Sequence, residues 1–147
     1  MKEVFTKVLQ VGIVVDNLEA YMKRYEEDFG IGPWEVLYFN KDNVREMTVY
    51  QEKKDFSIKV GFCDYYNVQL ELIEPLDLND TNIYTEFLRE HGPGLHHIAL
   101  DTNDHDETVN EMEKRDVKVI QSGIGRKKFT YFDLRKELGF IGEIYGK

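Results

Sequence analysis

The chain has 147 residues, of which 41% are hydrophobic, 13% aromatic and 32% charged, with a formal net charge of −9 at pH 7. This composition predicts one globular domain or two small fused halves, and it excludes a disordered chain. The acidic balance disfavours nucleic acid as a partner, and no apolar run approaches the roughly 20 residues of a membrane-spanning helix.

Cys63 is the single cysteine of the chain, so an internal disulfide is excluded. It lies in the run KVGFC, which is typical of a buried strand and has no neighbouring base to make the thiol a nucleophile. The first residues, MKEVF, lack the apolar core of a secretory signal. Together these features predict a cytoplasmic protein with no membrane partner.

The first half of the chain predicts one helix among several strands. A strand begins at Gln10, and Gly30 favours the end of the helix that follows it. The apolar stripe of that helix, at spacings of three and four, comprises Leu18, Tyr21, Met22, Tyr25 and Phe29. Alternating apolar residues then predict strands at residues 34–39, 45–51, 57–62 and 68–74.

The second half follows a linker of about residues 80–92, in which residues 83–91 predict a short helix. A strand then begins near His97 and leads into a mostly charged helix, with Val109 and Met112 as its apolar contacts. Alternation predicts three further strands at residues 118–122, 129–134 and 140–145.

An internal echo relates the two halves. The stretch QVGIVV–DNLEA from residue 10 and the stretch HIALDT–NDHDE from residue 97 have the same order of apolar and polar segments. Both are typical of a strand, a turn whose Asp or Asn accepts the first free helix N–H groups, and a helix. The echo predicts two tandem βαβββ modules in a single domain of residues 1–147. Module 1 spans about residues 5–76, and module 2 spans about residues 94–147.

Strand alternation predicts which side chains share the face opposite the helices. In each half the first strand offers one polar side chain on that face, and the last strand offers one carboxylate. Small residues at Gly12 and Ala99 leave room there. If the halves pair, four side chains converge: Gln10, Glu71, His97 and Glu143. An imidazole and two carboxylates in one place are typical of a divalent metal site.

Each of these residues also has a plainer interpretation. A glutamate on a strand is most often solvated, and a lone histidine is more often a surface or core residue than a ligand. The matched positions in two echoing halves favour the metal site. His96, next to His97, is expected to face the other way and to bond behind the site or pack in the core.

A short basic cluster, Arg126, Lys127 and Lys128, stands out from the acidic background. One interpretation is a solvated hairpin turn. The other is a patch that binds the phosphate of an anionic substrate. The residues alone leave both interpretations open.

Four stretches carry a family resemblance: VGIVVDNL from residue 11, ELIEPL from residue 71, GLHHIA from residue 94 and GFIGE from residue 139. They resemble the vicinal oxygen chelate superfamily, also called the glyoxalase/bleomycin-resistance/dioxygenase group, and the epimerase-like branch in particular. The resemblance covers nearly the whole chain. It implies an α+β fold in which the two modules form a cupped, partly open, barrel-like mixed sheet with helices outside. Relatives are often dimers, so a homodimer is expected.

By this resemblance the metal ligands of the family fall on Gln10, Glu71, His97 and Glu143, the same four that alternation selects. The epimerases carry His at the first of these positions, where this chain has Gln10. Three oxygen donors and one nitrogen favour Mn²⁺, Mg²⁺ or Co²⁺, with Zn²⁺ and Ni²⁺ as the remaining alternatives. A single histidine is too few for a ferrous dioxygenase.

The resemblance implies a metal-dependent isomerase of the methylmalonyl-CoA epimerase type. Such an enzyme moves a proton through a metal-stabilised enediolate of a small-molecule substrate, here an acyl-CoA. Glu143 is the implied catalytic base. The second base of the epimerases is a Glu from the early strands; Asp42 and Glu46 lie near that segment, and the resemblance assigns the role to neither. Two alternatives remain: a glyoxalase I-like lactoylglutathione lyase, and a non-catalytic small-molecule-binding module of the bleomycin-resistance kind.

Overall fold

The computed structural model describes residues 3–64 and 67–146. Residues 1–2, 65–66 and 147, which the predicted domain includes, lie outside the described residues. The helices and strands run in the order β1 (Val8–Val14), α1 (Leu18–Phe29), β2 (Glu35–Phe39), β3 (Arg45–Val49), β4 (Glu52–Lys53), β5 (Ile58–Cys63), β6 (Gln69–Pro75), α2 (Ile83–His91), β7 (Gly94–Leu100), α3 (His105–Lys114), β8 (Val119–Ile124), β9 (Lys128–Leu134) and β10 (Phe140–Gly146).

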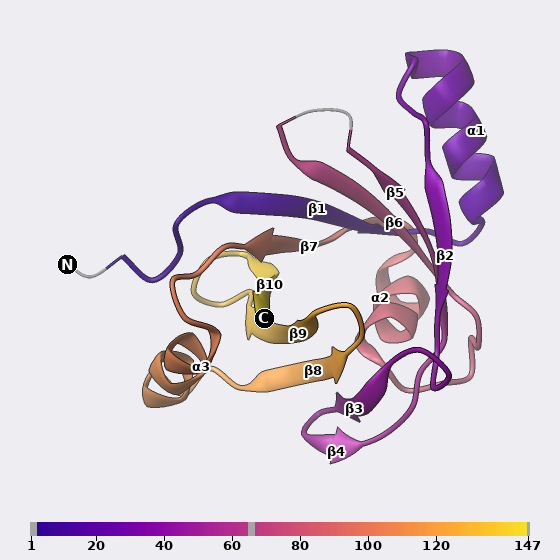
Figure 1. The fold of residues 1–147 in the computed structure, drawn as a ribbon. Helices are drawn as coiled ribbons and strands as arrows, with labels where there is room; N and C mark the ends of the chain where they lie inside the picture. The colour runs from indigo at the N-terminus through magenta and orange to yellow at the C-terminus, as the bar shows by residue number, and fades with distance from the viewer. Residues whose placement is uncertain (1–2, 65–66, 147) are drawn as a thin grey trace.

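The strands form one mixed sheet in the order β2-β5-β6-β1-β7-β10-β9-β8-β3-β4. Each half contributes four strands in the same arrangement, β1-β6-β5-β2 and β7-β10-β9-β8. The pairs β1–β6 and β7–β10 are parallel, and the other pairs within each set are antiparallel. β1 and β7 join the halves as antiparallel neighbours. The sheet curls into the predicted cup, open on one side (Figure 1).

The hairpin of β3 and β4 departs from the predicted arrangement. The sequence predicts a strand of the first half at residues 45–51. β3 is there, but it pairs with β8 of the second half. The Oγ atoms of Thr48 and Ser122 lie 2.6 Å apart across this pairing. The hairpin of the first half therefore extends the sheet of the second half beyond β8, whose other neighbour is β9.

The three helices do not all lie outside the cup. α1 packs against β5 and β6, and α3 packs against β10. α2 contacts β6, β1 and β7, and its Ile83 and Tyr84 are buried in the inner core beside Val14, Ile73 and Ile141. This linking helix therefore closes one end of the cup (Figure 1). Within residues 3–64 and 67–146, no helix is long and apolar enough to span a membrane.

The first helix follows its predicted stripe except at the end. Asn17 caps it by accepting a hydrogen bond from the Ala20 N–H at 3.0 Å, and Gly30 ends it with a φ of 66°. Leu18 is fully buried at its start. Phe29, by contrast, is 72% exposed, because it is the last helical residue and the packed stripe ends one turn earlier.

Candidate metal centre

A row of side chains crosses the inner face of the sheet at one level. The strand register places Gln121 opposite Tyr131, and Tyr131 opposite Glu143. Glu143 is in turn opposite Ala99, and Ala99 is opposite Gln10. Cross-strand partners share a face of the sheet. The row therefore puts Gln10 of the first half and Glu143 of the second half on the same surface.

A second row, two residues away, adds the other two predicted ligands. Gly12 is opposite both Glu71 and His97. Ligand atoms of Glu71, His97 and Glu143 lie within 4.8 Å of one another. The Nε2 of His97 is 3.1 Å from Oε1 of Gln10, 3.3 Å from Oε1 of Glu143 and 3.4 Å from Oε1 of Glu71. The structure thus brings together all four side chains, and all four are buried.

Gly12 provides the space that His97 occupies. A Cβ atom built at Gly12 would overlap the imidazole ring of His97. Any larger side chain there would have to displace the ring, because the backbone of β1 is held on both sides by strand pairing. A glycine at position 12 is therefore needed for the ring of His97 to reach the centre.

Burial and charge oppose each other at His97. Its burial favours the neutral ring, but hydrogen bonds and charges from Glu143 and Glu71 outweigh this and raise the pKa of His97 to about 9. Burial is also the main cause that raises the pKa of Glu71, and the charge of Glu143 acts in the same direction. The two buried carboxylates therefore favour a cation at His97 or beside it.

His96 determines which nitrogen of His97 faces the oxygens. The sequence predicts that His96 points away, but a β-bulge between β1 and β7 makes it an extra residue, and both rings are buried. Nε2 of His96 lies 3.3 Å from the carbonyl oxygen of Ile83, which can only accept, so this nitrogen carries the hydrogen. Burial, followed by the charge of His97, lowers the pKa of His96 and keeps it neutral.

Nδ1 of His96 is consequently an acceptor. It lies 2.9 Å from Nδ1 of His97, whose N–H donates to it. This bond leaves Nε2 of a neutral His97 with a free lone pair directed at Gln10 and the two carboxylates. A histidine whose other ring N–H donates a hydrogen bond to a neighbouring group is typical of metal ligands.

The four donors fit a divalent cation. The amide of Gln10 can take two orientations. With its oxygen inward it faces only acceptors, and with its nitrogen inward it donates to Glu71 and Glu143. The first orientation is favoured by positive charge at the centre, whether from a metal ion or from a protonated His97. Octahedral coordination at about 2.1 Å separates neighbouring donors by about 3.0 Å, and the oxygens here lie 3.1 to 3.4 Å from Nε2 of His97.

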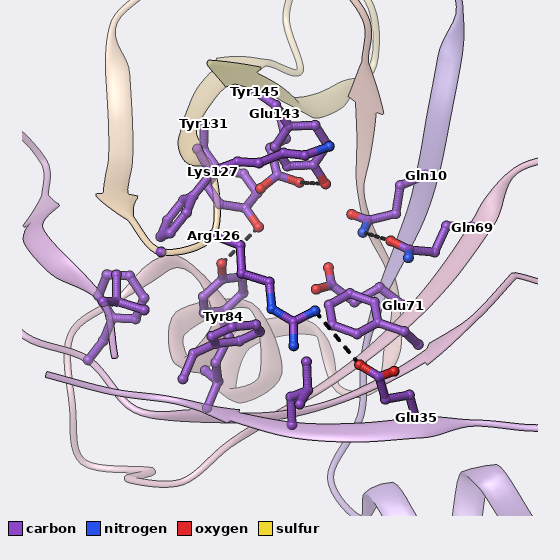
Figure 2. A pocket seen from close by; sticks show the side chains of 18 of the residues that line it. Gln10, Glu35, Gln69, Glu71, Tyr84, Arg126, Lys127, Tyr131, Glu143 and Tyr145 are labelled. Atoms are coloured by element: carbon purple, nitrogen blue, oxygen red, sulfur yellow. Dashed lines mark hydrogen bonds and ion pairs between the residues drawn. The ribbon is translucent and has the colours of Figure 1, made fainter. Parts of the chain in front are cut away.

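The centre lies on the wall of a cavity of about 380 Å³. Gln10, Glu71, Glu143 and Tyr145 turn their polar atoms into this space (Figure 2). The remaining wall is mostly aromatic and aliphatic, with Leu37, Phe39, Val44, Phe56, Ile58, Phe62 and Phe129. The cavity therefore offers a small polar centre to the reactive part of a ligand and an apolar surface to the rest.

The predicted basic patch lies partly at this cavity. Arg126 and Lys127 line it, whereas Lys128 is exposed and is not among the described lining residues. Nη1 of Arg126 lies 3.9 Å from Oε1 of Glu35, which comes from β2 of the other half (Figure 2). Both side chains are well exposed, so this ion pair contributes little to stability. Arg126 is therefore free to exchange Glu35 for an anionic ligand.

The suggested second bases are not in the cavity. Asp42 lines a separate surface hollow, and Glu46 is exposed in β3 with a φ of 54°. The cavity carboxylates apart from the centre are Glu35 and Asp64. Neither Asp42 nor Glu46 is among the described lining residues of the cavity, although Val44, which lies between them in the chain, is.

Several polar side chains of the site were not among the predicted ligands. The Tyr145 hydroxyl donates to Oε1 of Glu143 at 3.1 Å, and Nε2 of Gln10 donates to Oε1 of Gln69 at 2.6 Å. Strand alternation already places Tyr145 and Gln69 on this face. Tyr131 follows from the same rule once β9 is known to pair with β10. Tyr84 comes from α2, and no local pattern predicts it.

A sequence model of the Glyoxalase/Bleomycin resistance protein/Dioxygenase superfamily matches residues 9–132, which run from β1 into β9. The chain belongs to this superfamily. The predicted resemblance is thereby confirmed for the family and for its cupped α+β fold. A relative in Bacillus subtilis (strain 168), the uncharacterized protein YqjC, is 28% identical over 138 residues, which are 91% of this chain and 87% of that protein.

Solved structures of methylmalonyl-CoA epimerases have a similar fold. Methylmalonyl-CoA epimerase from Mycobacterium tuberculosis has a TM-score of 0.70 and 19% identity, with 99% of this chain and 91% of that chain covered. A variant of the Streptomyces coelicolor methylmalonyl-CoA epimerase, in complex with 2-nitronate-propionyl-CoA, has a TM-score of 0.66 and 20% identity, with 97% and 98% covered. At these identities the similarity establishes the fold of this chain.

Proposed function

We propose that this protein is a metal-dependent isomerase of the methylmalonyl-CoA epimerase type. The observation that carries the proposal is the convergence of Gln10, Glu71, His97 and Glu143 on one buried centre beside a cavity. Solved relatives of the same fold are named as methylmalonyl-CoA epimerases. The reaction would move the proton on a carbon next to a thioester carbonyl.

The four side chains would hold Mn²⁺, Co²⁺ or Mg²⁺. Such a cation supplies fixed positive charge beside the substrate oxygens, where negative charge develops. Glu143 holds the transferred proton in this proposal. Its carboxylate is buried, borders the cavity and accepts a hydrogen bond from Tyr145, which orients it.

The decisive experiment measures proton exchange directly. Protein loaded with Mn²⁺ or Co²⁺ is incubated with methylmalonyl-CoA in D₂O, and loss of the α-proton is followed by mass spectrometry. Glu143→Gln should lower the exchange rate by at least about 100-fold. Glu137→Gln, which alters an exposed glutamate, should leave the rate unaltered. Absence of exchange with either metal, or full exchange by Glu143→Gln, would overturn the proposal.

A second candidate is the glyoxalase I-like lyase. A proton shift between adjacent carbons on one face needs only one base, and Glu143 borders the cavity. Conversion of the methylglyoxal–glutathione hemithioacetal would distinguish it. A non-catalytic binding module would show neither activity, and its purified form would carry no stoichiometric metal.

The substrate is proposed to be anionic at the cavity mouth. Arg126 and Lys127 stand there, and a solved epimerase binds an acyl-CoA analogue. Arg126→Ala combined with Lys127→Ala should raise KM for the acyl-CoA about tenfold while leaving kcat within about twofold, because these residues lie away from the reacting atoms. Lys128→Ala is the matched control. Equal effects of the two changes would contradict a specific role for the pair.

A further inference from the structure

Two buried tyrosines form the wall of the cavity on the side away from Gln10 and Gln69 (Figure 2). Tyr84 comes from α2 and Tyr131 from β9, and each is only 2% exposed. The hydroxyl of Tyr84 donates to the hydroxyl of Tyr131 at 2.8 Å. Burying hydroxyls in an apolar wall is costly unless they are hydrogen-bonded. Phenylalanine would pack there without that cost, so the pair of hydroxyls calls for a chemical role.

Gln121 of β8 lies opposite Tyr131 in the strand register. Oε1 of Gln121 accepts from the backbone N–H of Ile83 at 2.9 Å. The Nε2 atom of Gln121 is buried and has no hydrogen-bond partner among the described residues. The hydroxyl hydrogen of Tyr84 is therefore used by Tyr131.

The hydroxyl hydrogen of Tyr131 has no acceptor among the described residues. Within residues 3–64 and 67–146 its only hydrogen bond is the one it accepts from Tyr84. Tyr131 lies opposite Glu143 in the strand register, and its ring meets that of His97 edge-on with centroids 5.0 Å apart. Its hydroxyl and the carboxylate of Glu143 face the same space (Figure 2). An uncommitted donor therefore borders the metal centre.

We propose that Tyr131 is a catalytic residue whose hydroxyl donates a hydrogen bond to the substrate oxygen that becomes negatively charged when the proton leaves. Tyr84 is the positioning residue, because its own hydroxyl donates to Tyr131 and leaves the hydrogen of Tyr131 for the cavity. The inference rests on the proposed function, since it assigns a donor to the same reaction. The phenol keeps its proton throughout, so no covalent change occurs at Tyr131. Such a preorganised donor adds to the fixed charge of the cation.

Oxalate is a suitable probe, because its planar dianion carries two adjacent oxygens and needs neither coenzyme A nor turnover. Its affinity for the Mn²⁺-loaded protein is measured by calorimetry, together with the affinity for Mn²⁺ itself. Tyr131→Phe should weaken oxalate binding about 10- to 100-fold and leave Mn²⁺ binding within about twofold. Tyr84→Phe should weaken oxalate about three- to tenfold. Tyr38→Phe, an exposed tyrosine on β2, is the matched control and should change neither affinity.

The outcomes separate this inference from the proposed function. Unaltered oxalate affinity in Tyr131→Phe, a parallel loss of Mn²⁺ affinity, or no oxalate binding by the unaltered chain would overturn the inference. If Tyr131→Phe fails to fold, Tyr84→Phe decides, because it leaves Tyr131 in place. Selective loss of oxalate binding without proton exchange on methylmalonyl-CoA would keep the donor and remove only the proposed reaction.

Discussion

At His97 a proton and a metal ion compete for the same ring nitrogen, Nε2. Its Nε2 faces three oxygens, and it carries either a proton or a lone pair for a metal ion. His96 holds the other nitrogen in both cases. The raised pKa of His97 means that the metal-free protein keeps the proton at neutral pH. Metal binding must therefore displace it.

The first prediction concerns this proton. Because the pKa of His97 is about 9 in the folded chain and about 6.5 unfolded, its pairing stabilises the metal-free protein fully below pH 6.5. That stability is lost as the pH rises through about 9. Mn²⁺ affinity should change in the opposite direction, rising about tenfold per pH unit up to about pH 9. Calorimetry at pH 7.5 in two buffers should show close to one proton released, and no release would contradict the assignment.

The second prediction concerns Gly12. In Gly12→Ala the new methyl group overlaps the ring of His97, so the ring should move out of the centre. We expect a loss of about 1 to 3 kcal/mol in the free energy of unfolding of the metal-free protein, and at least tenfold weaker Mn²⁺ binding. Gly125→Ala is the control, because its Cβ would meet nothing closer than 3.7 Å. Unaltered Mn²⁺ affinity in Gly12→Ala would refute the role of this glycine.

At the scale of elements, α2 connects the linker to the chemistry. Its N-cap, Asn82, is 1% exposed and accepts hydrogen bonds from the N–H groups of Tyr84 and Thr85, both at 3.0 Å. The cap therefore determines where the helix starts and how Tyr84 enters the cavity wall. α1 has a comparable cap at Asn17, but that cap lies at the surface.

The third prediction compares these two caps. Asn82→Ala should lower the free energy of unfolding by about 2 kcal/mol, because it leaves buried N–H groups without an acceptor. Asn17→Ala should cost about 0.5 to 1 kcal/mol, since water can replace an exposed cap. Urea unfolding of both variants measures the difference. A larger loss from Asn17→Ala than from Asn82→Ala would show that α2 is not held in this way.

At the scale of the whole molecule, the centre spans the boundary between the two halves. Gln10 and Glu71 come from β1 and β6, whereas His97 and Glu143 come from β7 and β10. The halves also share the β1–β7 pairing and the β3–β8 pairing. A cation at the centre therefore bridges two sets of strands that are already adjacent, and it should stabilise them as one unit.

The fourth prediction follows from this bridge. Mn²⁺ at 100 times its dissociation constant should raise the free energy of unfolding by about 2.7 kcal/mol. Thermal unfolding should remain a single transition that shifts upward with Mn²⁺ and returns on addition of a chelator. His97→Ala should abolish the shift. Separate transitions of which only one responds to Mn²⁺ would contradict a centre shared by both halves.

Features that depend on local periodicity can be predicted from the amino-acid sequence. Alternation along a strand is a property of a few consecutive residues, so it selected Gln10, Glu71, His97 and Glu143 before any strand was paired. The repeated strand–turn–helix pattern predicted the modules in the same way. Helix α2 was predicted over its whole length, because capping and apolar spacing are also local.

Features that depend on which strands pair with each other cannot be predicted in this way. The bulge that makes His96 an extra residue exists only in the pairing of β1 with β7, and β3 of the first half pairs with β8 of the second half. Tyr84 reached the wall because α2 closes the cup. These contacts join residues far apart in the chain, and their geometry is determined by packing between elements, which no local pattern records.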